Sequence, residues 1–371
     1  MAHSAFDEGR RAARWCIAQG LQDVAVVGAG AAGIGAARSL KDAGVRVLLL
    51  EARGRIGGRA WSVELPSGGA SRVVMELGAN WLQQGARNTL APVAEAIGCR
   101  LVPTDFHRPL ELGQPAGVGP ETTGAVMAQL HARVDQATAS GDRPLAEVVD
   151  AFLAHPHPFD RETVQRVVDS EVLLDTGAPL GELSARLGFE AGVGAGDRWI
   201  ASGYRSVLGA LAEGLDLRLD CSVSRIRWSD DGVQLDHADG TLEADAVIVT
   251  VPAAVLQEDR PQVEPPLPAP QRAALSLLTA GRVEKAALVF SERWWPRSAD
   301  GYIRIADGAG RISEWLDLSD ALGVPAITAI FVGDWARELW DGHDDASVAA
   351  RVAAVLQGAS DSQSVRAPTQ S

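Results

Sequence analysis

The chain has 371 residues, 34 Lys plus Arg against 48 Asp plus Glu, a formal net charge of −14 and 46% hydrophobic residues. At about 150 residues per domain, this length predicts two or three domains with a sizeable core. The acidic balance and the lack of a long basic run argue against nucleic acid as a partner, because a polyanion needs an extended face of Lys and Arg.

The cysteines, histidines and apolar runs exclude further classes. Cys16, Cys99 and Cys221 are widely spaced and form no CxxC pair, which argues against a disulfide framework or a zinc site and predicts a reducing compartment, the cytoplasm. His155-Pro-His157 is the main histidine cluster, which we interpret as a loop between helices, so no metal is predicted. The apolar stretch 244–256 is too interrupted to span a bilayer, and the N-terminal stretch lacks the apolar region of a signal peptide.

The first predicted elements are a strand, a helix and a second strand. Residues 23–28 form an apolar run of strand length closed by glycine, residues 34–44 have helical spacing and a glycine stop, and residues 46–51 are typical of a buried strand with an acid at its end. A β-α-β order within about 30 residues is the setting in which a glycine motif between strand and helix is informative.

Gly28, Gly30 and Gly33 form a GxGxxG motif between that strand and that helix. The glycines allow a tight turn, a close approach of the backbone to a diphosphate and close helix packing, while the helix N-terminus offers free N–H groups. Glu51, 18 residues beyond Gly33, can accept hydrogen bonds from ribose hydroxyls. The unit predicts a dinucleotide site, and the glycines alone do not choose between NAD and FAD.

The middle of the chain changes from helical to strand patterns. Helical periods between about residues 87 and 195 predict a helical insertion or second domain. A helix is expected after Gly203, and the apolar strand 246–251 is expected to return to the first sheet. The other segments with clear periods in this part are helices at 122–139 and 145–154 and strands at 217–219, 223–228 and 233–237.

The last third predicts a second sheet and a final helix. A proline-rich connection at 261–270 precedes two strands at 286–290 and 326–331. A helix is expected over 345–357, and 358–371 is expected to be a loose polar tail.

A second glycine pair follows the ribose acid and carries a resemblance. Arg53, Gly57, Gly58 and Arg59 place glycines and guanidinium groups just past Glu51, where a second diphosphate contact is expected. With this long fingerprint the sequence resembles the flavin-dependent amine oxidases, a family that includes monoamine oxidases, polyamine oxidases and flavin-type histone lysine demethylases. The resemblance implies FAD as the cofactor.

The resemblance extends over most of the chain. The segment Gly78-Ala79-Asn80-Trp81 resembles the one that passes under the flavin ring in the family, and Gly203-Tyr204 resembles the next landmark. Val223 matches a residue whose backbone holds the adenine side of FAD, and the strand that ends at Pro252 matches the one beneath the cofactor. The resemblance implies an α/β fold, with a Rossmann-type, glutathione-reductase-like FAD-binding domain interleaved with an α+β substrate domain.

The predicted domains are discontinuous because the chain leaves the first sheet and returns to it. We expect the FAD-binding domain at 20–85 and 200–258, and the substrate domain at 86–199 and 259–357. Residues 1–19 are expected to be an N-terminal extension.

Lys285 is the predicted catalytic residue. It lies in the segment 281–290, ahead of Trp294 and Trp295, at the position where the family has a lysine that holds a water near the flavin N5 atom. Lys41 and Lys285 are the only lysines among 34 basic residues, so a retained ammonium in this strand is mild independent support. An ammonium is compact and titratable, and arginine is not equivalent to it.

The function implied by the resemblance is FAD-dependent oxidation of a small amine to an imine and then an aldehyde, with O2 reduced to H2O2. Two alternatives remain open, namely a non-catalytic remnant or interaction module of the same fold, and another flavin enzyme such as an amino-acid oxidase or a desaturase. Which amine is used, and the oligomeric state, do not follow from the sequence.

Two departures from the family pattern affect this expectation. Gln83-Gln84 stands where many relatives place a Glu or His before glycine, so a substrate contact is expected to differ there. Relatives continue for roughly another 80 to 100 residues, comparable to a small domain. We therefore expect the chain to bind FAD poorly or not at all, and stoichiometric flavin absorbance at about 450 nm would contradict this expectation.

Overall fold

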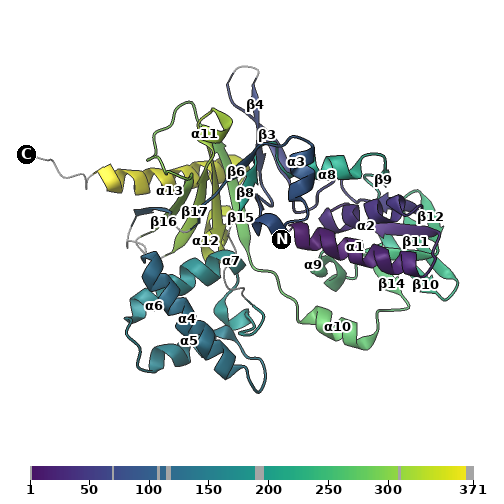
Figure 1. Cartoon of the computed structure of the whole chain (residues 1–371), viewed down its shortest axis with the longest axis horizontal. Coiled ribbons are helices and arrows are strands. Elements are labelled where there is room, and N and C mark those ends of the chain that lie inside the picture. The colour runs from purple at the N-terminus through teal and green to yellow at the C-terminus, as the bar shows by residue number, and fades with distance from the viewer. Residues whose placement is uncertain are drawn as a thin grey trace, which may run out of the picture. The chain divides into compact units, whose positions relative to one another are not determined.

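The computed structural model describes residues 2–68, 71–106, 109–113, 118–188, 196–307 and 311–364. The chain divides into two compact units, each built from separated stretches (Figure 1). Unit 1 comprises Met1–Glu64, Val74–Val102 and Asp197–Thr279, and unit 2 comprises Leu65–Val73, Pro103–Gly196 and Ala280–Ser371. The functional domain limits given above stay a prediction, and the units differ from them mainly in that residues 86–102 and 259–279 belong to unit 1.

The central sheet of unit 1 is parallel. Its described strands lie in the order β13 (Ala246–Val249), β1 (Asp23–Val27), β2 (Arg46–Leu50) and β9 (Asp216–Arg218). The helix α2 (Ala31–Asp42) connects β1 to β2. Apolar runs such as β1 suit a sheet that is covered on both faces. This is the α/β, Rossmann-type arrangement that the sequence predicts.

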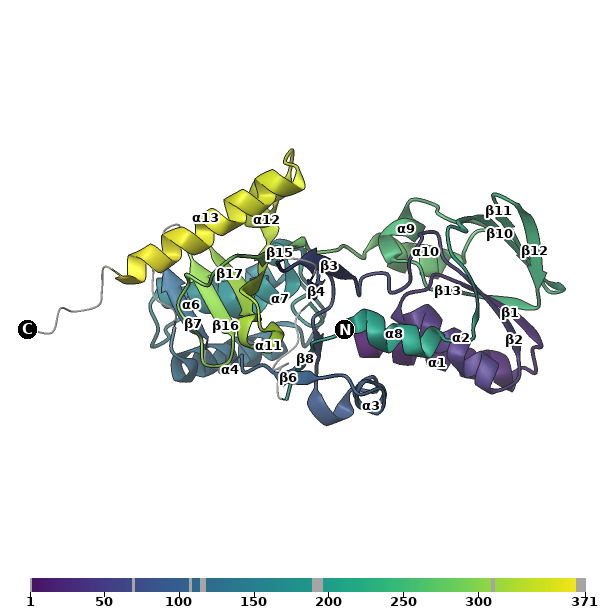
Figure 2. The ribbon, with the colours of Figure 1, turned by 90° about the horizontal axis from the view of Figure 1, so that it is seen from above.

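Helices cover one face of this sheet. The contributing helices are α1 (Ala2–Ala18), α2 and α8 (Tyr204–Ala212), which share one apolar cluster with the sheet residues Val24, Val26 and Leu49. Figure 2 shows these helices on one side of β1 and β2. The predicted N-terminal extension is therefore a helix of the core.

A second sheet covers the opposite face. Its described strands lie in the order β12 (Gly240–Ala244), β11 (Gly232–His237), β10 (Val223–Ser229) and β14 (Gln262–Glu264). Val223, Ile226 and Leu235 of this sheet pack against Ala25 and Val27 of β1. β14 lies inside the proline-rich segment predicted as a connection and pairs in parallel with β10, so that segment is only partly irregular.

The remaining described elements of unit 1 are short. β5 pairs with β8 in a small sheet that also contains β6, and β3 pairs with β4 in a hairpin whose tip belongs to unit 2. These elements are β3 (Ser62–Pro66), β4 (Arg72–Glu76), β5 (Trp81–Leu82), η1 (Gly85–Arg87), α3 (Ala91–Ala96), β6 (Leu101–Pro103), β8 (Arg198–Ile200), α9 (Ala253–Gln257) and α10 (Ala269–Ser276).

Unit 2 contains a mixed sheet. Its described strands lie in the order β15 (Val283–Val289), β18 (Ala326–Val332), β17 (Ile312–Asp317), β16 (Tyr302–Ala306) and β7 (Leu110–Gly113). One face packs against α12 (Gly333–Trp340) and α13 (Asp345–Ser364), with Phe331 and Trp335 in the shared core. The prediction of a loose tail from residue 358 is wrong as far as Ser364, because α13 continues that far and buries Ala359 one turn after Leu356.

The predicted helical insertion is a small bundle in unit 2 with its own apolar cluster, visible around α4 to α6 in Figure 1. His155 and His157 lie between α5 and α6, as predicted, and the His157 ring stacks on Phe152 with 4.9 Å between ring centroids. Unit 2's helical elements outside the sheet cover are α4 (Pro120–Ala137), α5 (Leu145–Ala154), α6 (Arg161–Val168), η2 (Asp169–Leu173), α7 (Leu174–Thr176), η3 (Leu180–Glu182) and α11 (Ser319–Leu322).

The described residues contain neither a membrane-spanning helix nor a cluster of metal ligands. They contain no helix long and apolar enough to cross a bilayer. They also contain no group of three or more His, Cys, Asp or Glu side chains placed to hold a metal ion.

Candidate functional site

The turn from β1 to α2 has the geometry that the glycine motif predicts. Gly28 has a φ of +102°, and its N–H donates to the Leu50 carbonyl at 2.7 Å. A Cβ on Gly33 would lie 1.7 Å from the Gly28 carbonyl oxygen, so the first turn of α2 can sit this close to the strand only with glycine there. These two positions are constrained by the turn itself.

Gly30 differs from its neighbours because it borders open space. It has an ordinary φ of −78°, and a Cβ built on it meets nothing within 4 Å. It is the N-cap residue of α2, and no side chain caps this helix. The first N–H groups of an uncapped helix, with the positive end of its dipole, form an anion site.

Glu51 holds this turn in shape. Its carboxylate is buried and accepts from the N–H of Ala29 at 2.8 Å and from the N–H of Arg53 at 3.0 Å. A carboxylate has about four acceptor positions, so two remain after these bonds. The carboxylate therefore keeps acceptor positions for the predicted contact with ribose hydroxyls, and it also has a structural role that the sequence did not indicate.

The second glycine pair lies beside the first motif. Gly57 donates its N–H to the Ala29 carbonyl at 2.8 Å, and a Cβ on Gly58 would lie 3.4 Å from the Gly30 Cα. Arg53 and Arg59 are exposed next to this pair. The structure thus brings together the two glycine groups and the arginines that the sequence assigns to the diphosphate.

Arg55 was not singled out from the sequence, and it shapes the same turn. Its guanidinium donates to the Gly58 carbonyl at 3.0 Å and lies over the Trp61 ring at 4.6 Å from the centroid. Burial lowers the pKa of the Arg55 guanidinium, and the nearby charge of Arg53 adds to the lowering. The sequence does not distinguish Arg55 from Arg53 and Arg59, because a segment with three closely spaced arginines is typical of an exposed turn.

The segment 78–81 is held against residues 59–61 of the glycine region. The Ala79 N–H donates to the Arg59 carbonyl at 3.0 Å, and a Cβ on Gly78 would lie 1.8 Å from that carbonyl oxygen. Asn80 is buried, and Trp81 is partly buried and pairs with Trp199. The predicted cofactor segment therefore lies in unit 1 with the two glycine motifs.

Glu76 is a further residue that the sequence did not assign. Its carboxylate is buried at the N-terminus of α8, where it accepts from the Tyr204 N–H and from the Ser62 hydroxyl, each at 2.6 Å. A Cβ on Gly203 would meet the same carboxylate at 2.6 Å. The Tyr204 hydroxyl donates to the Trp81 carbonyl at 2.6 Å, and burial raises the pKa of this phenol. The Gly203-Tyr204 landmark thus supports the segment 78–81.

Val223 and Pro252 lie at the other strands of the site. Val223 is buried at the start of β10, beside Val27 in one apolar cluster. Pro252 is the N-cap residue of α9 and is exposed. Between β13 and Pro252, the Thr250 hydroxyl is 2.9 Å from the Val27 carbonyl and 3.0 Å from the Gly28 carbonyl. Thr250, which was not among the predicted site residues, connects the returning strand to the glycine turn.

These residues fit the diphosphate and ribose of FAD. The fit rests on the open space at Gly30, which a side chain would fill, and on the uncapped N-terminus of α2. Glu51 and Gly57 contact the β1–α2 turn directly, and the segment 78–81 contacts Arg59 just beyond the second glycine pair. Their assignment to individual parts of the cofactor stays a prediction.

Lys285 belongs to unit 2, in the middle of β15. The register aligns it with Ile330 of β18, Glu314 of β17, Arg304 of β16 and Glu111 of β7. Aligned residues point to the same face of a sheet, so these five side chains share a face. The opposite face carries the apolar core with α12 and α13. The Lys285 face is thus the polar one.

Arg304 is the centre of a charge network on this face. Its guanidinium donates to the Tyr302 hydroxyl at 3.1 Å and to the Glu171 carboxylate at 3.1 Å, and Tyr302 in turn donates to Glu314. Burial by itself lowers the pKa of Arg304, and Tyr302, Glu314 and Glu171 together raise it above the usual value. Burial also raises the pKa of Glu111, against the opposing effect of Arg304. This network could not be predicted from the sequence, because its members lie on β7, η2, β16 and β17, and only the tertiary fold brings them together.

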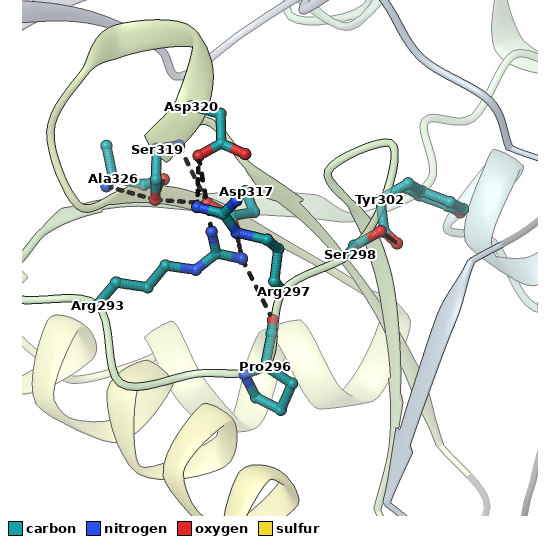
Figure 3. Close-up of polar contacts among 9 residues, drawn as sticks. All are labelled: Arg293, Pro296, Arg297, Ser298, Tyr302, Asp317, Ser319, Asp320 and Ala326. Atoms are coloured by element: carbon teal, nitrogen blue, oxygen red, sulfur yellow. Dashed lines mark hydrogen bonds and ion pairs between the residues drawn. The ribbon is translucent and has the colours of Figure 1, made fainter.

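The segment after β15 is anchored to the core of unit 2. Trp294 and Trp295 pack on Phe290 with centroid separations of 5.5 and 5.3 Å. Arg293 makes a buried ion pair with Asp317 at 2.6 Å, and Asp317 also accepts from the Ser319 N–H at 3.0 Å. Figure 3 shows the guanidinium groups of Arg293 and Arg297 turned toward Asp317 and Asp320. This cluster fixes the end of the strand that carries Lys285.

The sequence matches one protein family over most of its length. The sequence model described as "Flavin containing amine oxidoreductase" matches residues 31–368. Human lysine-specific histone demethylase 2 is 32% identical over 301 residues, which cover 76% of this chain and 36% of that protein. Polyamine oxidase 4 of Oryza sativa subsp. japonica is 30% identical over 343 residues, which cover 85% of this chain and 68% of that protein. The chain thus spans about a third of the demethylase.

A solved structure shows the same fold. A putrescine oxidase double mutant, from a structure-based redesign of its cofactor binding, has a TM-score of 0.69 to this chain at 21% sequence identity. The match covers 90% of this chain and 80% of that chain.

Proposed function

The chain belongs to the flavin containing amine oxidoreductase family, and from this premise we propose that it oxidises a small amine with FAD as cofactor and O2 as the electron acceptor. The observation that carries the proposal is the uncapped N-terminus of α2, where Gly30 borders open space and Glu51 fixes the turn. The three unpaired cysteines support a reducing compartment such as the cytoplasm.

Unit 1 supplies the residues for the cofactor. The N–H groups at the start of α2 would bind one phosphate, the segment with Gly57, Gly58 and the exposed Arg53 and Arg59 would bind the other, and Glu51 would accept from the ribose. Val223 would hold the adenine side through its backbone, and the segment 78–81 and Pro252 would contact the ring system. The assignments are supported by the contacts that connect Glu51, Gly57 and Thr250 to the β1–α2 turn.

The chemistry would be a two-electron oxidation at the carbon next to a neutral amine nitrogen. Bound FAD would accept the hydride equivalent and pass the electrons to O2, which gives H2O2. The imine takes up water and yields an aldehyde and an amine or ammonia. Lys285 would act as a proton carrier or hold a water, because its ammonium is a compact titratable donor.

A matched pair of glycine variants tests the cofactor site. Gly30→Ala should leave the folded chain intact, because the added Cβ enters open space, and should weaken FAD binding by about tenfold or more because it fills the diphosphate site. Gly33→Ala should instead destabilise the protein by about 1–3 kcal/mol, since its Cβ would overlap the Gly28 carbonyl.

The measurement is quenching of FAD fluorescence together with thermal unfolding for each variant. The titration should extend to a large excess of FAD so that weak binding is also detected. Equal FAD affinity in Gly30→Ala and the parent chain would contradict the proposed position of the diphosphate.

Turnover identifies the reaction. The protein loaded with FAD should release H2O2 with a panel of mono-, di- and polyamines, measured by a peroxidase-coupled assay. Amino acids offered in parallel distinguish an amino-acid oxidase. Two outcomes would contradict amine oxidation. One is peroxide release with amino acids but not with amines, and the other is that the protein binds FAD but releases no peroxide with any amine of the panel.

A further inference from the structure

The turn after the segment 78–81 is strained. Gln84 has a φ of +64°, a left-handed conformation that a residue with a side chain rarely adopts, and Gly85 follows with a φ of +48°. Such conformations cost about 1–3 kcal/mol and persist when surrounding contacts impose them. The contacts around residues 83–90, named here the glutamine turn, therefore decide where Gln83 and Gln84 lie.

Asn88 is the internal brace of the glutamine turn. Its side-chain oxygen accepts from the Leu90 N–H at 3.0 Å, and its side-chain nitrogen donates to the Gln83 carbonyl at 2.8 Å. These two partners fix the orientation of the amide, since the reverse orientation would place two oxygens together and two N–H groups together. Asp197 adds a second support, because its carboxylate accepts from the Gln84 N–H at 2.9 Å.

His3 of α1 completes the brace. The His3 Nδ1 atom lies 3.2 Å from the Asn88 side-chain nitrogen, and both residues are buried. Because that nitrogen is a donor, Nδ1 has to accept, which puts the ring proton on Nε2. The contact therefore defines one tautomer of His3 and uses the second N–H of the Asn88 amide.

Helix α1 is itself fixed in place. A Cβ on Gly9 would lie 1.8 Å from the Ala32 carbonyl oxygen, so α1 and α2 are in backbone contact. One turn beyond His3, the Asp7 carboxylate accepts from the Thr89 hydroxyl at 3.1 Å. Two side chains from one rigid helix thus hold two neighbouring residues of the glutamine turn.

We propose that His3 is a positioning residue for the glutamine turn. It acts through Asn88, whose amide it anchors to α1 and whose side-chain nitrogen bonds the Gln83 carbonyl, and so supports the left-handed conformation of Gln84 shortly after Asn80 and Trp81. The effect of His3 on substrate binding rests on the proposed function, because the resemblance to the family implies a substrate contact at Gln83-Gln84. The brace itself does not depend on that function.

The test compares His3→Ala with His3→Asn. Asparagine can place its side-chain oxygen near the position of Nδ1 and accept the same hydrogen bond, whereas alanine cannot. Arg14→Ala, an exposed change on the same helix, is the control. Hydrogen exchange measured by mass spectrometry on a peptide covering 81–90 reports the turn without any ligand, and steady-state kinetics with amines reports the consequence.

His3→Ala should speed exchange in this peptide by about tenfold, the loss expected for one buried hydrogen bond, with exchange in β1 and β2 unchanged. His3→Asn should restore slow exchange, and Arg14→Ala should not change it. KM should rise more than kcat falls in His3→Ala. The proposal would be overturned if His3→Ala speeds exchange uniformly throughout unit 1, or if exchange in the 81–90 peptide is as fast in His3→Asn as in His3→Ala. If His3→Ala speeds exchange in this peptide but the parent chain shows no amine turnover, the proposed function is contradicted and the role of His3 in the turn is not.

Discussion

Asp317→Ala is expected to lower the free energy of unfolding of unit 2 by about 3–5 kcal/mol. Asp317 and Arg293 have 4% and 15% of their side chains exposed, so the ion pair is largely removed from water. The variant leaves the buried guanidinium with only the longer ion pair to the exposed Asp320, at 3.9 Å, and the Nε atom of Arg293 already has no hydrogen-bond partner among the described residues. The Ser319 N–H and hydroxyl lose their acceptor as well.

Urea unfolding followed by tryptophan fluorescence and circular dichroism measures this effect. Arg297→Ala is the matched control, because Arg297 and its partner Asp320 are 71% and 68% exposed and such a pair contributes about 0–1 kcal/mol. The double change Arg293→Met with Asp317→Leu should recover most of the loss, since replacing both charges with apolar groups is often neutral. Equal losses in Asp317→Ala and Arg297→Ala would contradict the expected cost of an uncompensated buried charge.

Lys285→Met is expected to lower amine turnover by about a hundredfold, the scale of a lost proton-transfer group. Methionine keeps the length of the side chain and removes the ammonium. The folded state should be retained, because Lys285 lies on the polar face of the sheet and the apolar core is on the other face. Stopped-flow measurement of amine oxidation and of reoxidation by O2 separates the two half-reactions.

Lys41→Met is the natural control because Lys41 is the only other lysine. It is exposed on α2, donates to the Gly214 carbonyl and should leave turnover unchanged. Lys285→Arg tests whether charge alone suffices, and we expect it to remain impaired. Undiminished turnover in Lys285→Met would remove Lys285 from the reaction.

The elements that the sequence predicted are those with a strong local pattern. β1, α2 and β2 follow from two apolar runs around a glycine turn, and later strands such as β11 follow from the alternation of apolar and polar residues. The turn at Gly28 and Gly33 was predictable because a positive φ at Gly28 and a close backbone contact at Gly33 require glycine, whereas Gly30 borders open space. In these places the local chemistry determines the structure.

The elements that the sequence missed depend on distant partners. β5 and β8 are two and three residues long and exist through pairing between Trp81 and Trp199. α1 carries polar residues on much of its surface, and its burial depends on the close contact of Gly9 with α2. The end of α13 was missed because alanine, serine and glutamine form a helix without any clear apolar period. No local pattern encodes such contacts.

The position of β13 has a consequence for how the chain is made. β1 is followed immediately by its neighbour β2, but its other neighbour and the hydroxyl that bonds the Gly28 carbonyl come 222 residues later. During synthesis β1 therefore remains an open sheet edge while the whole helical bundle of unit 2 emerges. Thr250 adds the last hydrogen bonds to the Val27 and Gly28 carbonyls, so we expect the glycine turn to be complete only after β13 has been synthesised and paired.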